Sequence, residues 1–160
     1  SYCDKNPPEQ VIAELQTLIE EYERIVTFHG MEKIKTIGDA LLATAGLLQR
    51  VDDPLVAAVR CGLDLVEGTR RVHPHWAIRV GIHHGPVVAG IVGRQQFLFD
   101  LWGDTVNTAA RIAAAANDNS IFMSGLGWMR IRHRCQAKSH GSFELKGKGK
   151  LELVECLSIK

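Results

Sequence analysis

Apolar residues in this 160-residue chain change from a helical to a strand period and back several times. Between residues 8 and 30 they recur every three or four positions, as in an amphipathic helix that a glycine ends. Two short strands follow at 32–37 and 40–47, joined by a tight turn at Gly38-Asp39. A hairpin that follows a long amphipathic helix indicates a mixed domain in which helices pack on a sheet.

The same alternation continues to the C-terminus. Asp52 or Asp53 is the expected cap of a second helix, and a third helix begins at Gly103-Asp104. The remaining strands are expected at 76–82, 87–92, 97–102, 121–123, 143–145 and 151–157. This order of elements is typical of α/β or α+β domains in the ferredoxin-like style, with a β-α-β unit whose first strand is not visible. We predict a single α+β domain over residues 1–160, of the ferredoxin-like βαββαβ type and lacking its first strand.

Charge and cysteine content exclude several functions. The chain has 19 Lys and Arg against 18 Asp and Glu, so its net charge of +1 gives no support to bulk binding of nucleic acid or of an acidic membrane. Its four cysteines form no CxxC pair, which indicates reduced thiols in a cytosol-like compartment. No apolar stretch approaches the roughly 20 residues that span a bilayer. We expect a cytoplasmic domain, attached to a membrane only through segments absent from this sequence.

Three apparent motifs are better explained by packing or solvation. The glycines at 81, 85, 90 and 93 match neither a phosphate-binding GxxxxGK[ST] loop nor a dinucleotide-binding GxGxxG loop. His83-His84 lack cysteine or carboxylate companions at metal-ligand spacing, and neighbouring side chains of a strand point to opposite faces. The basic run over 130–140 has no interleaved aromatic residues, so it is expected to be a solvated face.

Two stretches are harder to explain by packing alone. Asp39 lies at the hairpin turn, where an acid is a common turn former and becomes a metal ligand only beside a second acid. Asn107 and Arg111 are four residues apart on one helical face, and Asp100 precedes the turn that begins that helix. Such an arrangement suits a small phosphorylated ligand, although structural use is equally compatible with the spacing.

Four segments, matching in order and spacing, carry a family resemblance: Lys33–Ala40, Arg79–Gly90, Phe99–Arg111 and Lys146–Gly149. Together they resemble the catalytic domain of the class III nucleotidyl cyclases, the adenylate and guanylate cyclases. The resemblance extends over nearly the whole chain, from Pro8 to about Leu157, and its DLWGDTVN run is long and specific. It implies a ferredoxin-like core that works as a head-to-tail homodimer, with nucleotide sites at the interface.

The resemblance also implies how the nucleotide is held. Lys35 and Asp100 match the pair that reads the purine, and Asn107 matches the residue that orients the ribose. Arg111 matches the residue that stabilises the reacting α-phosphate. Asp100 can accept a hydrogen bond from the adenine 6-amino group and Lys35 can donate to ring N1, whereas guanine would mismatch both. Because the guanylate branch typically carries Glu and Cys at these positions, the resemblance implies ATP as substrate.

The phosphate and metal residues follow from the same pattern. Lys146 matches the lysine that holds the terminal phosphates, with Lys148 close enough to be the alternative. Asp39 matches the second of two aspartates that hold two Mg²⁺ or Mn²⁺ ions. The implied reaction converts ATP to 3′,5′-cyclic AMP and pyrophosphate, by attack of the ribose 3′-oxygen on the α-phosphorus of the same molecule.

One departure from the family concerns its first metal aspartate. That residue lies in a Phe-x-Asp-Ile-x-Gly-Phe-Thr-like strand just before the first helix, whereas this chain opens at Ser1-Tyr2-Cys3-Asp4. Asp4 stands in the wrong context to replace it. We therefore expect an N-terminally truncated cyclase domain that is weak or inactive by itself. The alternative is a degenerate, non-catalytic module that binds nucleotide or dimerises and regulates a partner.

Overall fold

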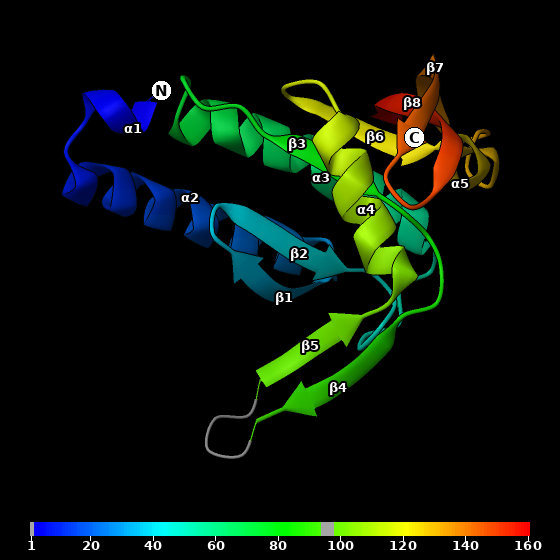
Figure 1. The fold of residues 1–160 in the computed structure, drawn as a ribbon, viewed down its shortest axis with the longest axis horizontal. Coiled ribbons are helices and arrows are strands. Elements are labelled where there is room, and N and C mark those ends of the chain that lie inside the picture. The colour runs from blue at the N-terminus through cyan, green and yellow to red at the C-terminus, as the bar shows by residue number, and fades with distance from the viewer. Residues whose placement is uncertain (1, 94–97) are drawn as a thin grey trace.

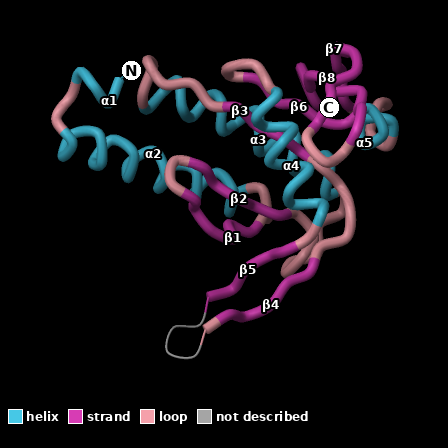
Figure 2. The backbone as a smooth tube through the Cα atoms, in the orientation of Figure 1, coloured by secondary structure: helices cyan, strands magenta, loops and turns pink. Residues whose placement is uncertain are grey.

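The computed structural model describes residues 2–93 and 98–160 (Figure 1). Helices and strands alternate along the chain, which confirms the predicted α+β class (Figure 2). None of the described helices is long and apolar enough to cross a membrane. The elements in chain order are α1 (Tyr2–Lys5), α2 (Pro8–Phe28), β1 (Glu32–Ile37), β2 (Ala40–Thr44), α3 (Pro54–Val72), β3 (Arg79–Ile82), β4 (Val88–Val92), β5 (Leu98–Trp102), α4 (Asp104–Ala115), β6 (Ser120–Ser124), α5 (Gly125–Met129), β7 (Cys135–Leu145) and β8 (Gly149–Ile159).

The described strands form three sheets. The largest has the order β3-β6-β8-β7, with β3 parallel to β6 and the other neighbours antiparallel. The antiparallel pair β1-β2 and the antiparallel pair β4-β5 are separate hairpins. Helices α2 and α3 pack against each other, and they contact β1 and β3 respectively. One helical layer therefore spans strands of two different sheets.

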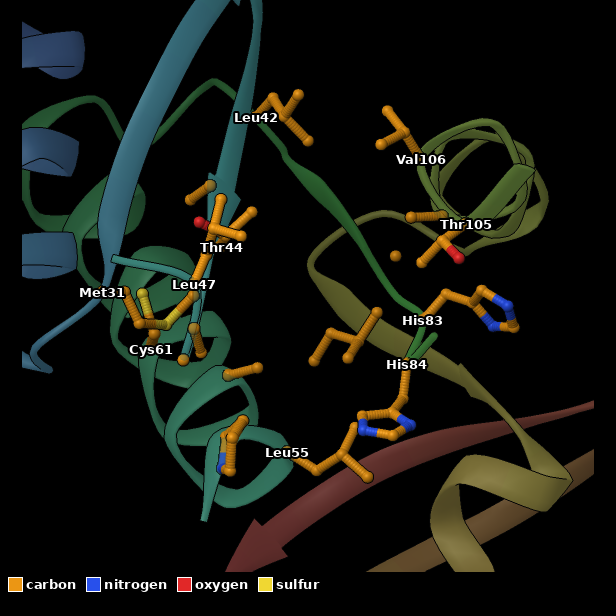
Figure 3. A pocket seen from close by; sticks show the side chains of 18 of the residues that line it. Met31, Leu42, Thr44, Leu47, Leu55, Cys61, His83, His84, Thr105 and Val106 are labelled. Carbon is orange, nitrogen blue, oxygen red and sulfur yellow. The ribbon is translucent and has the colours of Figure 1, made fainter. Parts of the chain in front are cut away.

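A gap separates β2 from β3. Among the described strands, β2 pairs only with β1 and β3 only with β6, although α3 connects β2 to β3. A cavity of about 520 Å³ lies between them, lined mostly by apolar side chains. Figure 3 shows Leu42 and Leu47 on one side of it, and Val106 and His83 on the other. In a split βαβ arrangement a further strand lies between the two that a helix connects, and no described strand fills that place here.

Local signals set most element boundaries. Asp53 caps α3 as predicted, since its side chain accepts a hydrogen bond from the Val56 amide at 3.3 Å. The strand expected at 76–82 begins only at Arg79, because Trp76 instead packs its ring against Tyr2 and His73. The predicted strand at 97–102 is described from Leu98, and residue 97 lies outside the described residues.

The largest difference between the predicted and the observed elements lies over residues 125–145. We predicted a strand only at 143–145, but β7 begins eight residues earlier at Cys135, and α5 precedes it. The alternation of buried and exposed side chains in β7 is irregular because the pairing with β8 shifts register between Ser139 and Ser142. Such a bulge hides the period of two that identifies a strand in sequence.

Helix α4 lies very close to β3. A Cβ atom added to Gly81 would meet the Ala113 backbone nitrogen at 2.3 Å and the Ala109 carbonyl oxygen at 2.4 Å. The helix is also anchored by Ile112, which is fully buried in a cluster with Phe122 and other apolar residues. A glycine in β3 therefore fixes how near α4 can approach the sheet.

Replacing Gly81 by alanine is expected to lower the free energy of unfolding by about 3 kcal/mol, because α4 must move away to admit the methyl group. Chemical denaturation measures the change. Gly90→Ala is the matched control, since its added Cβ would lie 3.4 Å from the Trp102 ring, an ordinary contact, and we expect it to change stability by less than about 1 kcal/mol. Equal stability of the Gly81→Ala and Gly90→Ala proteins would contradict the close packing.

Candidate functional site

Helix α4 carries two of the six predicted site residues. The chain enters the helix through Gly103, whose φ of 123° favours glycine. Thr108 and Ile112 form the buried stripe of the helix. Asn107 and Arg111 precede these two by one position each, so both lie beside the buried stripe, Asn107 exposed and Arg111 half-buried. The packing that holds α4 on the sheet thus leaves an amide and a guanidinium available to a ligand.

The predicted purine-reading pair lies on two strands that contact each other, β1 and β5. Lys35 is half-buried on β1, opposite Leu42 of β2. The backbone of Asp100 pairs with Gly90 in the β4-β5 hairpin, while its side chain lies outside what the structure describes. The fold therefore brings the two strands together within one chain, and the reading roles of Lys35 and Asp100 stay predictions.

Asp39 stands apart from these residues. It is exposed in the turn between β1 and β2, and in the view of Figure 1 this turn lies at the end of the hairpin away from α4. The described residues contain no group of three His, Cys, Asp or Glu side chains that could hold a metal ion. Asp39 alone does not make a metal centre, and the metal role predicted for it stays a prediction.

The predicted phosphate lysines lie in the turn between β7 and β8. Lys146 is exposed and has no ion-pair partner among the described residues. Lys148, in contrast, forms an ion pair with Asp104, the first residue of α4. No sequence signal points to this pair, because no spacing rule relates two residues so far apart in the chain.

His83 was also not predicted from the sequence to lie near the candidate site. It follows β3 and lines the cavity beside Thr105, and its buried Nδ1 has no hydrogen-bond partner among the described residues (Figure 3). Burial lowers the pKa of His83, and the nearby charges of His84 and Lys148 lower it further. The neutral imidazole is therefore favoured at neutral pH.

The cavity and the predicted nucleotide residues are distinct features. None of Lys35, Asp39, Asn107, Arg111 and Lys146 lines the cavity. Its lining is largely aliphatic, with Leu55 and Val80 among the side chains that face it, which suits packing rather than a triphosphate. The candidate nucleotide site is thus the surface formed by β1, β5, α4 and the β7-β8 turn.

Comparison with known proteins identifies the family of this chain. The family model of the adenylate and guanylate cyclase catalytic domain matches residues 1–156. The chain is 34% identical to the germination-specific adenylate cyclase of Dictyostelium discoideum over 158 residues, which cover 91% of this chain and 18% of that protein. It is 30% identical to the guanylate cyclase soluble subunit beta-2 of Rattus norvegicus over 155 residues, which cover 93% of this chain and 23% of that protein. This chain therefore spans about a fifth of the length of these two relatives.

A solved structure is similar over almost the whole chain. The guanylate cyclase domain of RhGC from Catenaria anguillulae, crystallised in complex with GTP, is 31% identical, and the two structures align with a TM-score of 0.92 over 99% of this chain and 90% of that one. The relatives include both adenylate and guanylate cyclases, so their names leave the purine open. This chain belongs to the adenylate and guanylate cyclase catalytic domain family, as the sequence resemblance indicates.

Proposed function

We propose that this domain is an adenylate cyclase that converts ATP to 3′,5′-cyclic AMP and pyrophosphate. The observation that carries the choice of ATP is the identity of two residues, Lys35 and Asp100, on contacting strands. A lysine can donate to adenine N1 and a carboxylate can accept from the 6-amino group, whereas guanine would leave both groups mismatched. A site built to hydrogen-bond one base discriminates strongly against the other.

The chain's own residues suit a reaction that depends on positioning. The ribose 3′-oxygen forms a bond to the α-phosphorus of the same molecule, the bond to the bridging oxygen of pyrophosphate breaks, and the 3′-hydroxyl proton is released. Because the attack is intramolecular, holding the substrate in an in-line pose supplies much of the rate. Asn107 orients the ribose, Arg111 stabilises charge that develops on the α-phosphate, and Lys146 holds the terminal phosphates.

Divalent ions belong to the same proposal. Mg²⁺ or Mn²⁺, two ions to a site, would neutralise the leaving group and activate the 3′-hydroxyl, with Asp39 as one ligand.

The site requires two copies in a head-to-tail homodimer, with Asp39 from one copy and the α4 residues from the other. The position of the Asp39 turn away from α4 in Figure 1 supports this arrangement. The β4-β5 hairpin also projects from the body of the molecule (Figure 1) and carries exposed apolar side chains: Val88 at 65%, Ile91 at 68% and Trp102 at 43%. A projecting apolar hairpin is the kind of surface that a partner chain covers.

Incubation with ATP and Mn²⁺ or Mg²⁺, with cyclic AMP quantified by mass spectrometry, tests the proposal. At neutral pH, we expect weak or no turnover by the 160-residue chain and clear turnover by the longest natural form that contains it. If no natural form makes cyclic AMP with either metal, the proposal is wrong. Binding of ATP without turnover would instead support the second candidate, a non-catalytic module that binds nucleotide or dimerises and regulates a partner.

A further inference from the structure

The ion pair between Lys148 and Asp104 joins two elements of the candidate site. The Lys148 side chain is only 19% exposed although that of Asp104 is 74% exposed, so the lysine folds down onto α4 rather than extending into solvent. We propose that this pair is a positioning clasp, which holds the turn that carries Lys146 at the beginning of the helix that carries Asn107 and Arg111. The inference rests on the proposed function and assigns Lys148 a different role from Lys146.

The turn is rigid enough to transmit the position of one lysine to the other. It consists of residues 146–148, and the Lys148 amide donates to the Leu145 carbonyl oxygen at 2.9 Å. Gly147 and Gly149 have φ values of 76° and 70°, which fix a tight left-handed path that other residues rarely adopt. With so few residues between them, holding the Lys148 side chain also holds the backbone from which Lys146 projects.

The other half of the clasp occupies the same helical face as the site residues. Asp104, Asn107 and Arg111 are spaced i, i+3 and i+7, which places them in one row along α4. The Thr108 hydroxyl donates to the Asp104 carbonyl oxygen at 2.8 Å, so the first turn of the helix is held in place. An anchor at Asp104 therefore brings the β7-β8 turn to the N-terminal end of the row that would bind ribose and α-phosphate.

The hairpin is also packed on α4 by apolar contacts. Leu145, which directly precedes the turn, and Leu153 share a buried cluster with Ile112 of α4, so the β7-β8 hairpin stays packed on the helix without the ion pair. An ion pair with one partner largely in solvent contributes little to folding. Removal of the clasp should therefore change where Lys146 lies and leave the fold intact.

A double-mutant cycle tests the clasp. Asp104→Asn and Lys148→Met should each raise the KM for ATP about threefold to fivefold, with kcat changed less than twofold, and the double variant should be no worse than either single variant. Lys150→Met is the matched control, because Lys150 is exposed two residues further on and has no ion-pair partner among the described residues. We expect its KM to equal that of the unaltered protein.

Two results would overturn the clasp. If Lys148→Met raises the KM while Asp104→Asn leaves it unchanged, Lys148 binds phosphate directly. If the two effects multiply in the double variant, the residues act independently.

Amine labelling keeps the test informative without turnover. An acylating reagent, followed by peptide mass spectrometry, should label Lys148 more slowly than Lys150, and Asp104→Asn should remove the difference. Equal labelling of Lys148 with and without the substitution refutes the clasp. Slow labelling in a protein that makes no cyclic nucleotide supports the clasp as a structural contact and refutes only the proposed function.

Discussion

The Arg111→Ala protein is expected to have a kcat for cyclic AMP formation lower by about 10²- to 10³-fold, with the KM for ATP changed much less. Arg111 is half-buried on α4, one turn beyond Asn107, where its guanidinium can face the charge that develops on the α-phosphate. Loss of one preorganised donor that acts mainly in the transition state costs roughly this factor. Steady-state kinetics with Mn²⁺ measures the change.

Arg70→Ala is the control for loss of an arginine as such. Arg70 lies exposed on α3 and pairs with Glu67 at 2.9 Å on the same helix, far in sequence from the candidate site. We expect it to keep full activity, and thermal unfolding should show both variants folded. If Arg111→Ala raises the KM for ATP without lowering kcat, Arg111 contributes only to binding of the ground state.

The paired substitution Lys35→Glu with Asp100→Cys should move preference from ATP toward GTP. Two mismatched hydrogen-bonding positions would then face adenine instead of guanine, so the ratio of kcat/KM for ATP to that for GTP should fall by at least about 10²-fold. The contact between β1 and β5 places both changes on neighbouring strands. Parallel measurement of cyclic AMP formed from ATP and cyclic GMP formed from GTP gives the ratio directly.

Each single substitution is informative beside the pair. Either one alone leaves one matched and one mismatched group, so we expect poor activity with both nucleotides. Lys33→Glu is the control on the same strand, because Lys33 is exposed and pairs with Glu23 of α2 rather than with a base. A preference for ATP that survives the paired substitution would contradict the assignment of the purine-reading residues.

Much of the fold was predictable because local sequence patterns identify its helices and strands. The hairpin at 32–44 has a short alternating strand on each side of Gly38, whose φ of 60° suits glycine, and the helix α3 has a capping aspartate and an apolar stripe. Strand β7 was predictable only at its end, since its bulge breaks the alternation. The strand predicted from residue 76 begins three residues later, at Arg79. Trp76 packs instead in an aromatic cluster with His73 and with Tyr2, which is distant in sequence.

The candidate site divides in the same way. Asn107 and Arg111 were recognisable because helical spacing places them on one face. The contact of Lys148 with Asp104 was not, because it depends on how a hairpin of eleven-residue strands folds back over α4. Long-range contacts of this kind are decided by packing, which no local pattern encodes.

The gap between β2 and β3 has a consequence for handling the protein. Each of these strands presents backbone N–H and C=O groups along an edge that no described strand satisfies, beside a largely aliphatic cavity. Open edges of this type act as templates for β-strands of other molecules, which is the usual origin of domain swapping and of amyloid-like association. Solutions of the 160-residue chain should therefore lose monodispersity as concentration rises, and short apolar peptides of strand-forming sequence should suppress that loss.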